Sequence, residues 1–124
     1  MIFRSIRAAL LALALLLPTT PVSADERDGW WETTAYTCPP HCGLTASGTQ
    51  VGYGSVAAPW WVPFGTPVLI DGWYVGTVQD RGGAIYGNRL DIWLPSYGEA
   101  MQWGRRSVWV SFGWPEELVL DSDH

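Results

Sequence analysis

Two aspartates flank a glycine-rich segment in the second half of the chain. Asp80 precedes Arg-Gly-Gly and Asp91 follows Asn-Arg-Leu, so a carboxylate stands at each end of residues 80–91. Apolar residues alternate with others over residues 74–79 and again over 90–94, which predicts a strand on each side. Two strands would then bring two carboxylates to one loop-built site. Such a pair can transfer protons to and from a substrate, or it can only cap a turn and pair with an arginine.

The first 24 residues have the pattern of a secretory signal peptide. A basic start is followed by an unbroken apolar run over residues 8–17 and by the small residues Val22-Ser23-Ala24. The apolar run is too short for a membrane span, and no cysteine follows the expected cut to carry a lipid. We therefore expect an exported protein of the cell wall or periplasm without a membrane anchor. Its mature part, residues 25–124, would be one monomeric domain.

Beyond that leader the chain is acidic. Two of the seven basic residues and none of the twelve acidic ones lie in the leader. Residues 25–124 therefore contain five arginines and twelve acidic residues, which gives them a net charge of −7. Binding to nucleic acid or to an anionic membrane needs a basic face. The charge therefore argues against both partners.

The two cysteines are close together in the segment Cys38-Pro39-Pro40-His41-Cys42. In an exported protein such a pair predicts a disulfide, here across a very short loop. A metal site with His41 between the cysteines is the alternative, but it offers only three ligands, and we expect no metal. No motif for a cofactor is present. His41 is interpreted as an exposed loop residue.

Short strands separated by glycine and proline dominate the rest of the chain. The predicted segments indicate a small, mainly β barrel of about six strands with one short helix. Asp71-Gly72 is typical of a tight hairpin turn, and Gly104 is expected to end the helix. The strands are expected at residues 30–36, 55–58, 68–70, 73–80, 90–94 and 107–112, and the helix within residues 95–103.

The alternation of side chains places the aspartate of the fifth strand. Asp91 shares a face with Trp93, while Leu90, Ile92 and Leu94 occupy the other. A carboxyl group between core strand residues should be partly sheltered, which raises its pKa and favours the protonated acid. In the last strand Val108, Val110 and Phe112 are expected to point inward.

Several short motifs together resemble the three-aspartate (3D) domain. That domain is a double-psi β-barrel found in MltA-type lytic transglycosylases and in secreted cell-wall proteins, and RlpA-like barrels share some of the same pieces. The resemblance covers about residues 30–112. The motifs are Thr45-Ala46-Ser47-Gly48, Val56-Ala57-Ala58-Pro59, Pro63-Phe64-Gly65-Thr66, Asp80-x-Gly82-Gly83-Ala84-Ile85-x-Gly87, Arg89-Leu90-Asp91, and Ala100 to Gly104 before a final strand.

The resemblance also assigns roles to the aspartates. Asp91 matches the third aspartate of the family, the proposed acid, and Asp80 matches the second, which supports it. The position of the first aspartate is occupied by Ala58, and a lysine common in the glycine block is replaced by Tyr86. One supporting carboxylate is thus missing.

This resemblance implies an enzyme that cleaves the MurNAc–GlcNAc bond of peptidoglycan and releases 1,6-anhydro products. Asp91 would serve as acid and then as base, so no second catalytic carboxylate is required. Candidate substrate-binding residues are Thr45, Ser47, Trp60, Trp61, Gly82 and Gly83. Trp60 and Trp61 can equally be core residues. Trp93, Trp103 and Trp109 fall in predicted strands or the helix and are interpreted as structural.

A second class of function stays open. Related double-psi barrels of the expansin kind bind glycans or loosen walls without catalysis, and Ala58 favours that alternative. Retention of Asp91 within the complete glycine block favours the enzyme.

Overall fold

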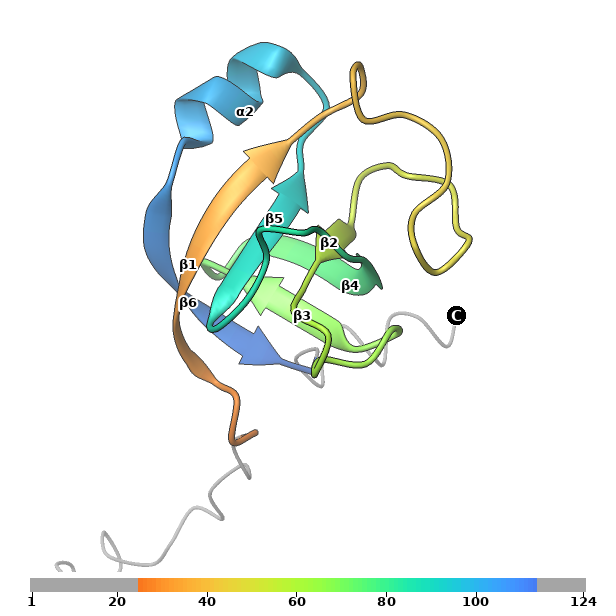
Figure 1. The fold of residues 1–124 in the computed structure, drawn as a ribbon. Coiled ribbons are helices and arrows are strands. Elements are labelled where there is room, and N and C mark those ends of the chain that lie inside the picture. The colour runs from red at the N-terminus through yellow and green to blue at the C-terminus, as the bar shows by residue number, and fades with distance from the viewer. Residues whose placement is uncertain (1–24, 114–124) are drawn as a thin grey trace, which may run out of the picture.

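The computed structural model describes residues 25–113 as a closed six-stranded barrel with a short helix at one end (Figure 1). The predicted signal peptide and residues 114–124 of the predicted domain lie outside the described residues. The elements are β1 (Gly29–Tyr36), β2 (Ser55–Ala57), β3 (Pro67–Ile70), β4 (Tyr74–Asp80), β5 (Arg89–Trp93), α2 (Tyr97–Trp103) and β6 (Arg106–Phe112). Mainly β structure, the six strands and the single helix confirm the predicted class.

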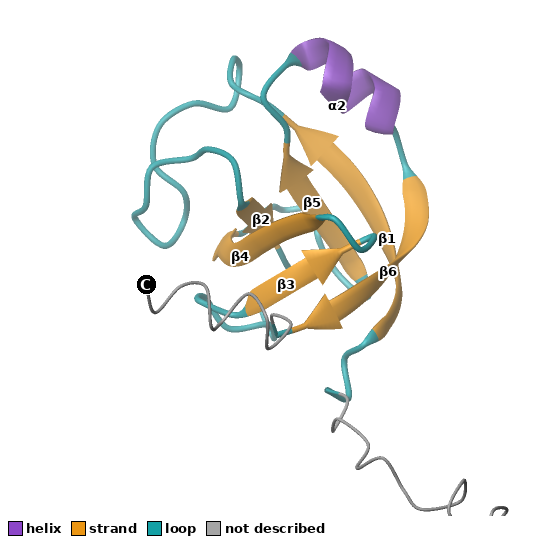
Figure 2. Cartoon of the chain, turned by 180° about the vertical axis from the view of Figure 1, so that it is seen from behind, coloured by secondary structure: helices purple, strands orange, loops and turns teal. Residues whose placement is uncertain are grey.

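The strands close in the order β1-β5-β2-β4-β3-β6. The pairs β1–β5 and β2–β4 are parallel, and the other four pairs are antiparallel. Figure 1 shows β1 and β5 running side by side toward the end at which α2 lies, and Figure 2 shows the same arrangement from behind. Closure pairs each of these six strands on both sides. It also brings residues far apart in sequence onto neighbouring strands.

The barrel interior is filled by the inward residues of every strand. Val108, Val110 and Phe112 point inward as predicted, each less than a tenth exposed. Trp103 is likewise buried. Trp109 lies on the opposite, outer face of β6, where it is 47% exposed and packs edge-on against Trp30.

The hairpin between β3 and β4 depends on two residues with positive φ. Asp71 has φ 54° and Gly72 has φ 75°, a conformation that suits a tight turn between twisted strands. The turn contains one residue more than predicted, since Ile70 pairs with Tyr74 and Trp73 lies in the loop.

Helix α2 begins with reciprocal capping. Ser96 Oγ accepts a 3.1 Å hydrogen bond from the Glu99 amide and donates one of 2.8 Å to Glu99 Oε2. Glu99 is therefore a capping residue, which accounts for a carboxylate at this position. The helix ends at Gly104, with φ 62°, as the sequence predicts. Among residues 25–113 no helix is long and apolar enough to cross a membrane.

Candidate functional site

The structure brings Asp80 and Asp91 to the wall of one open pocket of about 160 Å³. Asp80 is the last residue of β4 and Asp91 is the middle residue of β5. Other lining residues come from β1, β2, the disulfide loop and the glycine loop. They are Tyr36, His41, Ala57, Arg81, Gly82 and Ile85.

Strand β2 explains why the two aspartates meet. It lies between β4 and β5, and Ala57 is in register with both Asp80 and Asp91. A break in the β2–β4 register falls between Val56 and Ala57, next to the site. Bulges of this kind often redirect side chains beside functional sites. The small side chain of Ala57 leaves the space between the carboxylates open.

Asp91 is the sheltered carboxylate. Burial is the main cause that raises its pKa above the usual value of 3.8, and the negative charge of Asp80 adds to the rise. A 3.0 Å hydrogen bond from the Thr34 hydroxyl to Asp91 Oδ1 acts in the opposite direction, as do the charges of His41 and Arg89. The net shift is upward, so this group keeps its proton to a higher pH than an exposed aspartate. A raised pKa suits a group that must donate a proton.

Asp80 is held rigidly by main-chain donors. Its Oδ1 accepts hydrogen bonds from the amides of Ala46, at 3.0 Å, and Arg81, at 2.9 Å. Its carbonyl oxygen accepts a 3.2 Å hydrogen bond from the amide of Ala58. The orientation of this carboxylate is thus fixed by the Thr-Ala-Ser-Gly segment and by the amide of Arg81. Ala58, where the resembled family has its first aspartate, is fully buried and outside the pocket lining.

The predicted substrate residues Thr45 and Ser47 flank Ala46, whose amide binds Asp80, and they lie outside the pocket lining. Thr45 is buried, and its hydroxyl bonds to those of Thr49, at 2.6 Å, and Ser47, at 3.1 Å. The Ser47 amide donates a 3.0 Å hydrogen bond to the carbonyl of Gln79 on β4. These groups are not among the pocket lining. They shape the turn that presents the Ala46 amide to Asp80.

The remaining predicted substrate residues divide between pocket and surface. Gly82 lines the pocket, and a Cβ atom there would meet Ile85 Cγ1 at 2.9 Å. Gly83, Trp60 and Trp61 do not line it. Trp60 is 83% exposed, whereas Trp61 packs on the core residue Trp31 with ring centroids 5.5 Å apart. Neither tryptophan therefore lines the pocket that contains the two aspartates.

Arg81 connects the glycine loop to the segment that carries these tryptophans. Its guanidinium donates a 2.6 Å hydrogen bond to the carbonyl of Val62 and lies 4.1 Å from the centre of the Phe64 ring. Burial lowers its pKa, and the negative charge of Asp80 opposes that shift. Arg81 is thus a positive group fixed at the pocket wall.

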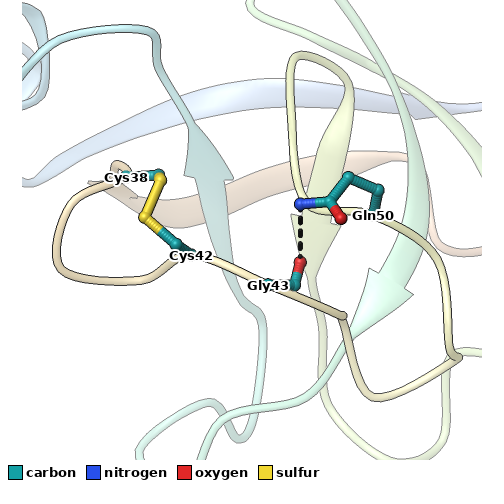
Figure 3. The surroundings of a disulfide bond; sticks show 4 residues. All are labelled: Cys38, Cys42, Gly43 and Gln50. Atoms are coloured by element: carbon teal, nitrogen blue, oxygen red, sulfur yellow. Dashed lines mark hydrogen bonds between the residues drawn. A yellow bond between two sulfur atoms is a disulfide. The ribbon is translucent and has the colours of Figure 1, made fainter.

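The predicted disulfide between Cys38 and Cys42 is present, with Cα atoms 4.8 Å apart. Figure 3 shows it closing its short loop, and beyond it the Gln50 side chain donating a 3.1 Å hydrogen bond to the carbonyl of Gly43. His41 lies in this loop and is exposed as predicted, but it also lines the pocket. Within the described part of the chain, no three His, Cys, Asp or Glu residues are grouped as a metal site would require.

Sequence reasoning missed Tyr36 and His41 as pocket residues. Tyr36 follows Thr34 by two positions in β1, so the alternation of the strand puts both on one face. The parallel register of β1 with β5 pairs Thr34 with Asp91. Knowledge of that pairing would have found Tyr36, but no local pattern contains it.

The second half of the chain matches a known protein family. Residues 55–112 match the model of the family described as the 3D domain. The match includes β2 to β6, with both aspartates, and begins after β1 and the Thr-Ala-Ser-Gly segment.

Two curated relatives come from Bacillus subtilis (strain 168). YocH, named as a cell wall-binding protein, is 36% identical over 73 residues, which are 55% of this chain and 25% of YocH. YabE, named for cell wall shaping, is 33% identical over 82 residues, 60% of this chain and 20% of YabE. The chain thus spans a quarter or less of the length of these relatives. On the family match and the closed six-stranded barrel, this chain belongs to the 3D domain family through residues 55–112.

Proposed function

We propose that this protein is exported to the cell wall and cleaves the MurNAc–GlcNAc bond of peptidoglycan as a lytic transglycosylase. The observation that carries the proposal is Asp91. It is a sheltered carboxylate with a raised pKa at the wall of an open pocket, which it shares with a second, rigidly held carboxylate. Both relatives are named for the cell wall, which supports the same substrate.

The reaction needs one group that donates a proton and then takes one back. Protonated Asp91 gives its proton to the glycosidic oxygen as the bond from that oxygen to the anomeric carbon breaks. The 6-hydroxyl oxygen of the same sugar then bonds to the anomeric carbon, and its proton returns to Asp91. The product is a 1,6-anhydro sugar, no water is consumed, and the acid is regenerated.

Asp80 supports this acid in two ways. Its negative charge contributes to the raised pKa of Asp91, which favours the protonated state before the reaction. The same charge lies beside the pocket where the sugar ring becomes positive in the transition state, so it stabilises that charge. Since Asp80 is held by two main-chain amides, it needs little reorganisation during the reaction.

The substitution at the first aspartate position favours a second candidate. The β2 wall of the pocket is Ala57, with no carboxylate, and Ala58 is buried behind it. A pocket with two carboxylates in place of three can bind a glycan without cleaving it. The printed name of YocH, a cell wall-binding protein, supports that alternative.

Digestion of purified peptidoglycan separates the two candidates. Mass spectrometry of the soluble products is expected to find 1,6-anhydro-muropeptides with the natural protein and none with Asp91→Asn. Both proteins should sediment equally with insoluble peptidoglycan, because an asparagine side chain has nearly the same shape as an aspartate. Binding without anhydro products by the natural protein would leave the non-catalytic function.

A further inference from the structure

Tyr36 lines the pocket, and its hydroxyl group is buried and has no hydrogen-bond partner among the described residues. Tyr74, another buried tyrosine of the barrel, is a useful contrast. Its hydroxyl donates a 2.6 Å hydrogen bond to the carbonyl of Trp93 and accepts one of 3.0 Å from the amide of Gly54. A buried hydroxyl without a partner costs free energy. On a residue that lines a pocket, it points to a ligand group that accepts a hydrogen bond from it.

The surroundings keep Tyr36 in the donor state. Burial raises the pKa of its phenol, and the negative charges of Asp80 and Asp91 raise it further. The hydroxyl therefore carries its proton throughout the physiological range. Beside the carboxylate of Asp80, which accepts hydrogen bonds, Tyr36 is a neutral donor of the pocket wall.

Asp80 provides the complementary acceptor. Both main-chain amides that hold this carboxylate donate to Oδ1, and within residues 25–113 no hydrogen bond is made to Oδ2. The side chains of Ile85 and Ala57 add apolar surface to the same pocket. The wall thus combines a donor, an acceptor and a small apolar contact.

A secondary amide with a methyl group presents the matching set. Its carbonyl oxygen accepts a hydrogen bond, its N–H donates one, and its methyl group needs apolar surface. We propose that the pocket recognises the 2-acetamido group of an N-acetylated sugar. Tyr36 donates to the acetamido carbonyl, Asp80 accepts from the amide N–H, and Ile85 contacts the methyl group.

This inference rests on the proposed function for the class of glycan, and it adds the chemical group by which that glycan is recognised. The acetamido group is attached to the carbon next to the anomeric carbon. Its binding against Tyr36 and Asp80 would therefore keep the glycosidic bond within the same pocket as Asp91. The contact that selects the sugar would then also place its glycosidic bond in the pocket of Asp91.

Two neutral oligosaccharides test the recognition directly. Chitotetraose and cellotetraose have the same β-1,4 backbone and differ in having an acetamido or a hydroxyl group at carbon 2. Isothermal titration calorimetry should show that the natural protein binds chitotetraose at least about tenfold more tightly, as expected when a site is built for a group that the competitor lacks. Equal affinity for the two sugars, or no binding of either, would overturn the inference.

Tyr36→Phe removes only the donor. The preference for chitotetraose is expected to fall by about three- to tenfold, the range for loss of one neutral hydrogen bond. The melting temperature should stay the same or rise, because the hydroxyl has no partner among the described residues of the folded barrel. Tyr53→Phe is the matched control, since Tyr53 is 59% exposed and outside the pocket lining, and it should keep the preference. A Tyr36→Phe protein that retains the full preference would refute the role of Tyr36.

The test is independent of the lyase reaction. Absence of 1,6-anhydro products from peptidoglycan would reject the proposed enzyme. The measured preference between the two tetrasaccharides would still decide whether the pocket recognises the acetamido group. Conversely, anhydro products formed by a protein that does not distinguish the tetrasaccharides would reject only the acetamido site.

Discussion

The hydroxyl of Thr34 on β1 donates a 3.0 Å hydrogen bond to Oδ1 of Asp91 on β5, across a parallel strand pair. This bond favours the ionised carboxylate and so opposes the effect of burial on its pKa. The pKa of Asp91 is therefore a balance in which burial is the largest raising cause and the Thr34 hydroxyl the largest lowering one.

Thr34→Val should disturb that balance without changing the size of the side chain. Loss of the donor raises the pKa of Asp91 further, so the alkaline limb of the pH–rate profile for anhydro product formation moves to higher pH. Thr34→Ser keeps the hydroxyl and should leave the limb in place. NMR titration of the Asp91 side-chain carboxyl carbon measures the same shift. A movement of the limb to lower pH in Thr34→Val would contradict the assignment.

Asp91→Asn should stabilise the folded protein in a pH-dependent manner. The folded pKa of Asp91 lies above the usual 3.8, so the folded state binds this proton more tightly than the unfolded chain does. Ionised Asp91 therefore reduces the free energy of unfolding as pH rises from about 3.8 through the raised pKa. At pH 7, above the raised pKa, the variant should therefore melt at a higher temperature than the natural protein.

At pH 3 the melting temperatures of the natural protein and Asp91→Asn should coincide, because Asp91 is then protonated in both states. Glu26→Gln removes a charge from an exposed residue and serves as the matched control at each pH. Differential scanning calorimetry provides the comparison. A variant less stable than the natural protein at pH 7 would show that the ionised form of Asp91 is favoured by folding.

Asp80→Asn and Asp80→Ala should separate structure from chemistry. An asparagine oxygen can accept the amides of Ala46 and Arg81, so Asp80→Asn should unfold in urea within about 0.5 kcal/mol of the natural protein. Asp80→Ala leaves both donors without their acceptor and should lose about 1–3 kcal/mol. Both variants should lose lyase activity, because both lose the charge. Similar stability losses for the two would mean that Oδ1 is not the structural element.

Removal of the disulfide should affect the site more than the barrel. For its very short loop the chain-entropy estimate is about 2 kcal/mol, the low end for such bonds. The Cys38→Ser/Cys42→Ser protein should thus still unfold cooperatively in urea, at a lower midpoint. Activity should fall severalfold because the loop that carries His41 into the pocket is released. Full activity in the variant would show that His41 and its loop are dispensable.

The sequence predicted those features that local patterns encode. Strand alternation gave the inward residues of β6, and the two apolar runs around the glycine segment located β4 and β5. The flanking core residues of Asp91 predicted partial shelter, and Asp91 is indeed half-buried, which is the main cause of its raised pKa. Gly104 ended the helix for the reason expected, a φ of 62°.

The composition of the pocket was not predictable in the same way. Tyr36 reaches Asp91 only through the pairing of β1 with β5, and His41 reaches it through a disulfide loop whose direction depends on the whole barrel. Thr45 and Ser47 of the Thr-Ala-Ser-Gly motif are candidate substrate-binding residues, yet their hydroxyl hydrogen bonds are made within their own segment.

The position of β1 between β5 and β6 limits how this domain can be divided. The family match begins at residue 55, but a fragment cut there would lack β1, together with Thr34 and Tyr36. Two neighbouring strands would then expose unpaired edges, the arrangement that promotes aggregation. The smallest part able to fold and to be transplanted between proteins therefore starts at or before Gly29, well upstream of the recognisable family segment.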